Sequence, residues 1–122
     1  MVYSLKQIIP SPSPDAGSDF GRTVCLYGNY LVVGDDDARD NKGRVYFYRM
    51  NIGSGQFDLI QTIRSPSTRV SDAFGDSVSL CGNYLVVGDS SAEIAPNDGK
   101  GRVYFYRMNA GSGQFDLIQT IP

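Results

Sequence analysis

The sequence predicts an all-β chain built from two equivalent units, each of four antiparallel strands. The first observation is a repeat: the stretch GRVYFYRMN stands unchanged at residues 43–51 and 101–109. The second is that turns containing glycine separate short segments rich in β-branched and aromatic residues, which is typical of consecutive hairpins. The third is that several of these segments are apolar on both faces.

The repeat covers nearly the whole chain. Residues 20–35 align with 74–89, and residues 43–63 align with 101–121. Near-identity of the copies indicates recent duplication or deliberate design, and both origins stay open. We divide the chain into an N-terminal strand with a proline-rich link at 1–19, a first unit at 20–66 and a second unit at 67–122.

Each unit is predicted to contain its four strands in simple order. The first strand, GRTVCLY in the first unit, ends at Gly28-Asn29, a pair that suits a two-residue type II′ turn. The second strand is YLVVG, and a polar loop separates it from the third strand, GRVYFYRM. A glycine-rich loop, in which positive φ is easily adopted, leads to the fourth strand, QFDLIQTI.

The alternation of side chains decides between two β architectures. Successive side chains of a strand point to opposite faces, so Val45 and Phe47 are expected opposite Tyr46 and Tyr48. The fourth strand is likewise apolar on both faces.

By the same alternation, Phe57, Leu59 and Ile63 are expected on one face of the fourth strand, opposite Ile60. The connections are too short to hold covering helices, so each sheet has to be stacked between two like sheets. This is the arrangement of β-propeller blades, of which about 4–8 close a ring. The alternative is a sandwich of eight strands, in which one face of each sheet meets water.

The motif FG-x-SV-x-L-x-GNYLVVG, followed by G-x-VYFY, resembles the FG-GAP repeat, the blade unit of the integrin α-subunit type of β-propeller. The resemblance implies an extracellular or cell-surface scaffold that binds or adheres. Many such repeats hold calcium in a DxDxDG loop between the first two strands. Here that position is only Gly28-Asn29 or Gly82-Asn83, which cannot supply the roughly 6–8 oxygens that calcium takes. We therefore expect no cofactor.

Two blades cannot close a ring, and soluble monomers avoid large exposed apolar patches. We therefore expect the chain to associate with itself, three copies giving six blades and four copies giving eight. The resemblance implies a propeller of about seven blades. Opening that geometry by one blade is expected to be easier than compressing it by one, so we favour a homotetramer over a homotrimer. The residues expected to carry the assembly are Tyr3, Leu5, Ile9, Tyr46, Tyr48, Tyr104, Tyr106, Phe115, Leu117 and Ile121.

The segment Tyr3–Ile9 reads as a further copy of the fourth strand, beside Phe57–Ile63 and Phe115–Ile121. One copy is surplus in any closed ring. We expect the N-terminal and C-terminal copies to compete for the same blade edge, and the N-terminal copy to act as a clasp on a neighbouring chain.

The polar loops of the two units are the candidate ligand sites. Asp35, Asp37 and Asp40 could hold calcium or magnesium, but the second unit does not keep their spacing, so a solvated turn is the preferred interpretation. A protein or glycan ligand is expected at the rim loops, and the residues proposed for it are Asp36, Arg39, Asn41, Glu93, Asn97 and Asp98.

Three further groups are interpreted as structural. The third-strand tyrosines could stack on sugars or bases, but packing between blades is preferred. Cys25 and Cys81 do not occupy equivalent positions, so small core residues are preferred over a disulfide. The paired carboxylates that a glycosidase would need have no defined spacing among Asp19, Asp58, Asp72 and Asp116.

Composition excludes several function classes. The chain of 122 residues has no histidine, which removes Ser-His and Cys-His catalysis. Its net charge of −2 argues against nucleic acid or an anionic membrane as partner. No apolar run approaches the ~20 residues of a membrane span, and no signal peptide is predicted in this chain.

The expected function is that of a non-enzymatic repeat module that self-assembles into a β-propeller. It would act as a binding or adhesion scaffold, or be an engineered or excised propeller fragment. The alternative is a carbohydrate-binding or hydrolytic propeller.

Overall fold

The computed structural model describes residues 3–12, 19–36, 43–66, 73–90 and 101–122. Within these ranges the chain forms eight strands and no helix. They are β1 (Thr23–Tyr27), β2 (Tyr30–Asp35), β3 (Arg44–Asn51), β4 (Gln56–Arg64), β5 (Ser77–Cys81), β6 (Tyr84–Asp89), β7 (Arg102–Met108) and β8 (Phe115–Ile121).

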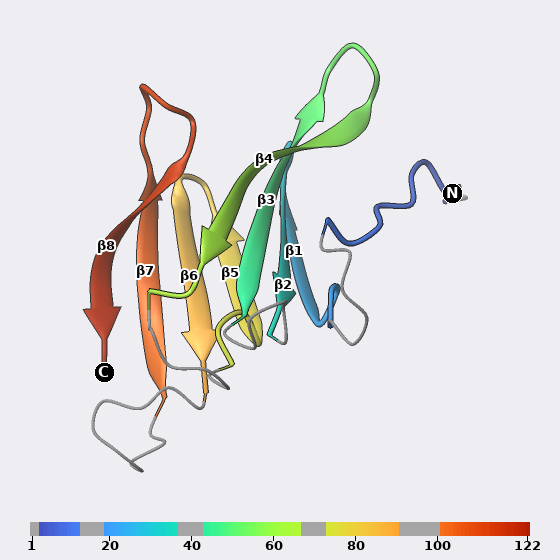
Figure 1. Ribbon diagram of the computed structural model, residues 1–122. Coiled ribbons are helices and arrows are strands. Elements are labelled where there is room, and N and C mark those ends of the chain that lie inside the picture. The colour runs from blue at the N-terminus through green and yellow to red at the C-terminus, as the bar shows by residue number, and fades with distance from the viewer. Residues whose placement is uncertain (1–2, 13–18, 37–42, 67–72, 91–100) are drawn as a thin grey trace.

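The strands form two four-stranded antiparallel sheets, a first sheet with the order β1-β2-β3-β4 and a second sheet with the order β5-β6-β7-β8. Every pair of neighbours is consecutive in the chain, as predicted. Figure 1 shows the two sheets side by side, with the β3–β4 and β7–β8 hairpins extending from the same end. The predicted all-β fold of two equivalent sheets is confirmed.

The glycine turns lie where the sequence predicts them. Gly28 and Gly82 have φ values of +57° and +58°, which only glycine adopts without strain. Next to the first turn, Tyr27 pairs with Tyr30, and the register of β1 and β2 continues without a shift to Thr23 and Gly34. The turn residues therefore set the register of each first hairpin.

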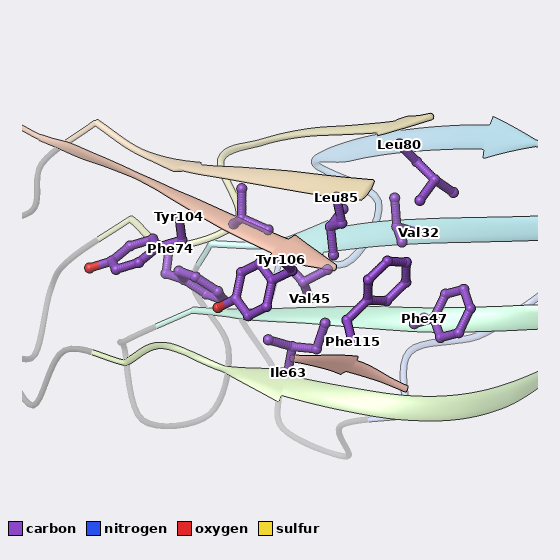
Figure 2. Close-up of a cluster of buried hydrophobic side chains, with 11 residues drawn as sticks. Val32, Val45, Phe47, Ile63, Phe74, Leu80, Leu85, Tyr104, Tyr106 and Phe115 are labelled. Carbon is purple, nitrogen blue, oxygen red and sulfur yellow. The ribbon is translucent and has the colours of Figure 1, made fainter. Parts of the chain in front are cut away.

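The core lies between the two sheets and is shown in Figure 2. Its buried residues are Val32, Val45, Phe47 and Ile63 from the first sheet, Phe74 from the loop before β5, and Leu80, Leu85, Val87, Tyr104, Tyr106 and Phe115 from the second sheet. Phe115 points at Phe47, with ring centroids 4.8 Å apart and planes at 77°. Edge-to-face pairs of this kind contribute beyond the area that they bury.

The predicted alternation along β3 is confirmed. Val45 and Phe47 belong to the core between the sheets, while Tyr46 and Tyr48 belong to a second cluster on the opposite face of the first sheet. Ile9 of the N-terminal segment packs against this second cluster. Both faces of the first sheet are therefore apolar and at least partly covered.

The predicted alternation along β4 is wrong. Gln61 and Leu59 pair with consecutive residues of β3, so Ile60 has no partner in the register. A bulge of this kind places two residues opposite one and exchanges the faces beyond it. Ile60 and Ile63 therefore contact the core between the sheets, while Phe57 lies in the second cluster.

The segment Tyr3–Ile9 does not form the predicted strand. Each fourth strand pairs with the third strand of its own sheet, and the described part of the chain offers no further third strand to this segment. It lies instead along the side of the first sheet that faces away from the second sheet (Figure 1).

Candidate assembly interface

The loop before β5 enters the first sheet at two glycines. A Cβ atom on Gly34 would overlap the carbonyl oxygen of Gly75, and a Cβ atom on Gly43 would overlap the carbonyl oxygen of Phe74. Gly75 has a φ of +91°, and a Cβ atom on it would lie 2.9 Å from the carbonyl oxygen of Arg44. We call Phe74-Gly75 and its equivalent Phe20-Gly21 the FG loops, and Gly34 with Gly43 the glycine groove of the first sheet.

Each FG loop is held by the aspartate that ends the second strand of its own sheet. The Asp89 Oδ1 atom accepts a hydrogen bond from the Ala73 amide at 2.8 Å, and the Asp35 Oδ1 atom accepts one from the Asp19 amide at 2.9 Å. Both aspartates are buried. A buried carboxylate needs such partners, so Asp35, a weak metal candidate of the sequence, orders the FG loop.

The aromatic residue of the FG loop anchors it to the third strand. Phe74 is 0% exposed, and its ring lies 5.4 Å from that of Tyr104 at 66°. Phe20 stands in the same relation to Tyr46, at 5.5 Å and 64°. The two FG loops are therefore built alike, although only the second one contacts another sheet.

A glutamine makes the second specific contact between the sheets. The Gln61 Nε2 atom donates to the Phe115 carbonyl at 3.0 Å, and the Gln61 Oε1 atom accepts from the Phe115 amide at 2.7 Å. Both backbone groups of Phe115 are therefore satisfied by one side chain of the neighbouring sheet. Gln114 adds a bond from its Nε2 atom to the Ile60 carbonyl at 3.3 Å.

On its outer face, the second sheet carries the same residues that the first sheet uses to contact the second sheet. Val45 and Ile63 are buried between the sheets, whereas their equivalents Val103 and Ile121 are 37% and 43% exposed. Tyr84 and Ile118, which are equivalent to Tyr30 and Ile60, are also exposed.

On its outer face, the first sheet carries the same kind of residues that the second sheet uses to contact the first sheet. Leu80 is buried in the core, whereas its equivalent Leu26 is 63% exposed, and Val24 is exposed as well. Both halves of the interface inside the chain are thus present a second time, on opposite sides of the molecule, and these positions are uncovered.

The residues predicted to carry assembly are divided by the structure into buried and exposed ones. Those buried within the chain are Tyr46, Tyr48, Tyr104, Tyr106 and Phe115. Those exposed are Tyr3, Leu5, Leu117 and Ile121, while Ile9 is half-buried. Tyr104 and Tyr106 pack between the two sheets, as the preferred interpretation expects, whereas Tyr46 and Tyr48 pack on the other face of the first sheet with Ile9 and Phe20. Their burial leaves no open stacking surface at these four positions.

Burial also changes the chemistry of the tyrosines. Loss of solvent raises the pKa of Tyr48 to about 12, with a smaller contribution from neighbouring Tyr46, and burial raises the pKa of Tyr106 as well. Within the described residues, the hydroxyl groups of Tyr48 and Tyr106 have no hydrogen-bond partner. They remain neutral hydroxyls at physiological pH.

Of the rim-loop candidates, the structure describes Asp36. Its carboxylate lies 3.9 Å from the guanidinium of Arg22. Burial, and after it a hydrogen bond and charge repulsion from Asp19, raise the pKa of Asp36, while Arg22 opposes this rise. The other proposed metal and rim residues lie outside the described residues: Asp37, Arg39, Asp40, Asn41, Glu93, Asn97 and Asp98. Among the residues that are described, no three acidic or sulfur side chains gather as a metal site.

The cysteines and the strand carboxylates are placed as follows. Both cysteines are free; Cys25 is half-buried against the core, whereas Cys81 is exposed, so the core interpretation fails for Cys81. Asp58 and Asp116 are exposed and accept hydrogen bonds from Asn51 and Asn109 at 3.3 and 3.2 Å. These carboxylates hold the long hairpin loops.

Residues 59–106 match the family model of the FG-GAP repeat. This segment of the chain is similar to an FG-GAP repeat. The matched segment runs from β4 through the FG loop and β5 and β6 into β7, so it includes the FG loop but not Gly34 and Gly43, which this loop contacts. A comparison with the curated proteins finds no match. In the described ranges there is no helix with the length and apolar character needed to span a membrane.

Sequence reasoning missed the glycine groove and the bridging glutamines between the two units. A signal was available for the groove. Gly34 and Gly43 recur as Gly88 and Gly101 at equivalent places of the two units, outside the hairpin turns. The partner of these glycines is distant in sequence, and only the fold brings it near.

Proposed function

We propose that this chain is a non-enzymatic FG-GAP module that associates with copies of itself into a closed β-propeller. The observation that carries the proposal is the repetition of both interface halves on the two outer faces. The second sheet of one copy can contact the first sheet of the next as the two sheets contact each other within the chain.

The geometry of such an assembly follows from its polarity. The two uncovered faces differ from each other, so the contact between copies is heterologous. A ring is the only closed assembly that such a contact allows. Exposed aliphatic positions such as Leu26 and Val103 support this closure, because their burial would remove apolar area from water at about 25 cal/mol per Å². Four copies are favoured over three.

A binding or adhesion role outside the cell belongs to the same proposal. FG-GAP repeats are typical of extracellular proteins, which supports this location. The buried carboxylates of Asp35 and Asp89 support a non-enzymatic module, since they order the FG loops. A protein or glycan ligand would bind at the rim loops, where Asp36 lies.

The native mass in solution tests the proposal. Light scattering behind size exclusion is expected to give a single species of four times the chain mass, unchanged on moderate dilution. A folded monomer at micromolar concentration would contradict ring closure. A panel of glycosidase substrates is expected to show no turnover, and turnover by the purified ring would contradict the non-enzymatic assignment.

A further inference from the structure

The second sheet contains an open groove at the place where the first sheet holds an FG loop. The groove has a volume of about 340 Å³, and Gly88, Gly101, Arg102, Val103 and Ile121 are among the residues that line it. These are the equivalents of the glycine groove of the first sheet and of its neighbours Arg44, Val45 and Ile63, and every residue type is the same.

The Phe20-Gly21 loop is built like the Phe74-Gly75 loop, which fills the glycine groove of the first sheet. The Phe20-Gly21 loop itself fills no groove. Gly21 has a φ of +92°, against +91° for Gly75. A Cβ atom on Gly75 would meet Arg44 and Val45, whereas a Cβ atom on Gly21 would meet nothing within 4 Å. The chain therefore carries an unoccupied groove and an unused FG loop of matching shape.

We propose that the groove at Gly88 and Gly101 binds the Phe20-Gly21 loop of a second copy. This inference rests on the proposed self-association and names the site that gives the association its register. The carbonyl oxygens of Phe20 and Gly21 would lie over Gly101 and Gly88, as those of Phe74 and Gly75 lie over Gly43 and Gly34.

The physical requirement is close approach of two backbones. At Gly34 and Gly43, even one carbon atom in place of hydrogen would overlap an incoming carbonyl oxygen. At Gly34, whose φ lies outside the left-handed region, a side chain is therefore excluded by contact with the loop alone, whereas Gly43 also has a φ of +87°. At Gly88 the same exclusion would act on a second chain, so a substitution there separates assembly from folding.

The first test is Gly88→Ala. Within its own chain the added methyl group would crowd the Ser77 hydroxyl, a flexible group that can turn away, so the monomer is expected to fold. Self-association is expected to weaken by at least about tenfold, where each tenfold corresponds to about 1.4 kcal/mol. The matched control is Gly111→Ala in the exposed β7–β8 hairpin, which is expected to assemble like the wild type.

The second test uses both sides of the contact. Gly21→Ala blocks the FG loop, and its own chain has room for the methyl group, although the positive φ strains the backbone. At a protein concentration between the dissociation constants of the wild type and of the weakened variants, each variant alone is expected to be monomeric. Mixed in equal amounts, they are expected to form a dimer and nothing larger, because each pair keeps one intact groove and one intact loop.

The outcomes separate this inference from the proposed function. If the wild type assembles and Gly88→Ala assembles equally well, the groove is not the site, and self-association stands. If the wild type is monomeric, both fail. If Gly88→Ala does not fold, as judged by circular dichroism, the Gly21→Ala variant decides, and its unchanged assembly would overturn the inference.

Discussion

Gln7 holds the backbone of Phe57 in the way that Gln61 holds the backbone of Phe115. The Gln7 Oε1 atom accepts from the Phe57 amide at 2.8 Å, and its Nε2 atom donates to the Phe57 carbonyl at 3.2 Å. Gln7 aligns with Gln61, and Phe57 aligns with Phe115. The N-terminal segment thus stands at the first sheet where β4 stands at the second, without forming a strand.

This relationship predicts a competition at Phe57. In a ring, β8 of a neighbouring copy would bring Gln119, the equivalent of Gln61, to this place. The N-terminal segment is weakly attached, since Tyr3, Leu5 and Ile8 are all more than three-quarters exposed, whereas β8 is paired along its length with β7.

We therefore expect deletion of residues 1–10 to strengthen self-association and Gln119→Ala to weaken it by roughly tenfold, since a hydrogen bond contributes about 0.5–1.5 kcal/mol. Sedimentation velocity over a dilution series measures both. Gln114→Ala, which removes a hydrogen bond inside the chain, controls for a general effect on β8. Weaker association after the deletion would show that the segment is a clasp on the neighbouring chain.

The glycine groove of the first sheet predicts a large loss of stability for Gly34→Ala. The methyl group would overlap the Gly75 carbonyl and crowd the Thr23 methyl group, and overpacking of this kind costs about 1–3 kcal/mol. The loss is measured by urea denaturation followed by circular dichroism. The equivalent Gly88→Ala variant is the matched control, and an equal loss in a monomeric Gly88→Ala would contradict the distinction between the filled groove and the open one.

The core between the sheets predicts unequal effects for two equivalent phenylalanines. Phe115 is buried against Phe47, so Phe115→Ala is expected to cost about 3–5 kcal/mol of unfolding free energy. Phe57 is only half-buried under the N-terminal segment, so Phe57→Ala is expected to cost clearly less in the monomer. Chemical denaturation compares the two, and equal losses would show that the sheets do not pack through Phe115.

The raised pKa of Tyr48 predicts a loss of stability at alkaline pH. Its ordinary pKa is 10.0 and burial raises it to about 12, so the folded chain binds the proton more tightly than the unfolded chain. The stabilising contribution is complete below about pH 10 and decreases as the pH rises toward about 12.

Tyr48→Phe is expected to leave stability at about pH 7 within roughly 1 kcal/mol, because the hydroxyl has no partner among the described residues. It is expected to reduce the loss between about pH 10 and pH 12. Urea midpoints at several pH values measure this, with Tyr3→Phe as the exposed control. An unchanged alkaline loss in Tyr48→Phe would contradict the assignment.

The sequence by itself determined the two units, the order of their strands, the glycine turns and the alternation along β3. These features depend on residues near each other in the chain: a turn pair sets a hairpin, and successive side chains of a strand alternate. The all-β fold and the FG-GAP resemblance could therefore be recognised before any coordinates.

Only the tertiary structure decided which faces β4 presents, how the FG loop enters the glycine groove, and where the N-terminal segment lies. The bulge at Ile60 shifts the alternation of faces by one residue, and no local pattern marks it. Gly34 and Gly75, or Gln61 and Phe115, come together only when two sheets pack, so their roles follow from contacts between distant residues. The same packing leaves Gly88 and Gly21 without the backbone contacts that Gly34 and Gly75 make, and the proposed contact with a second copy rests on this difference.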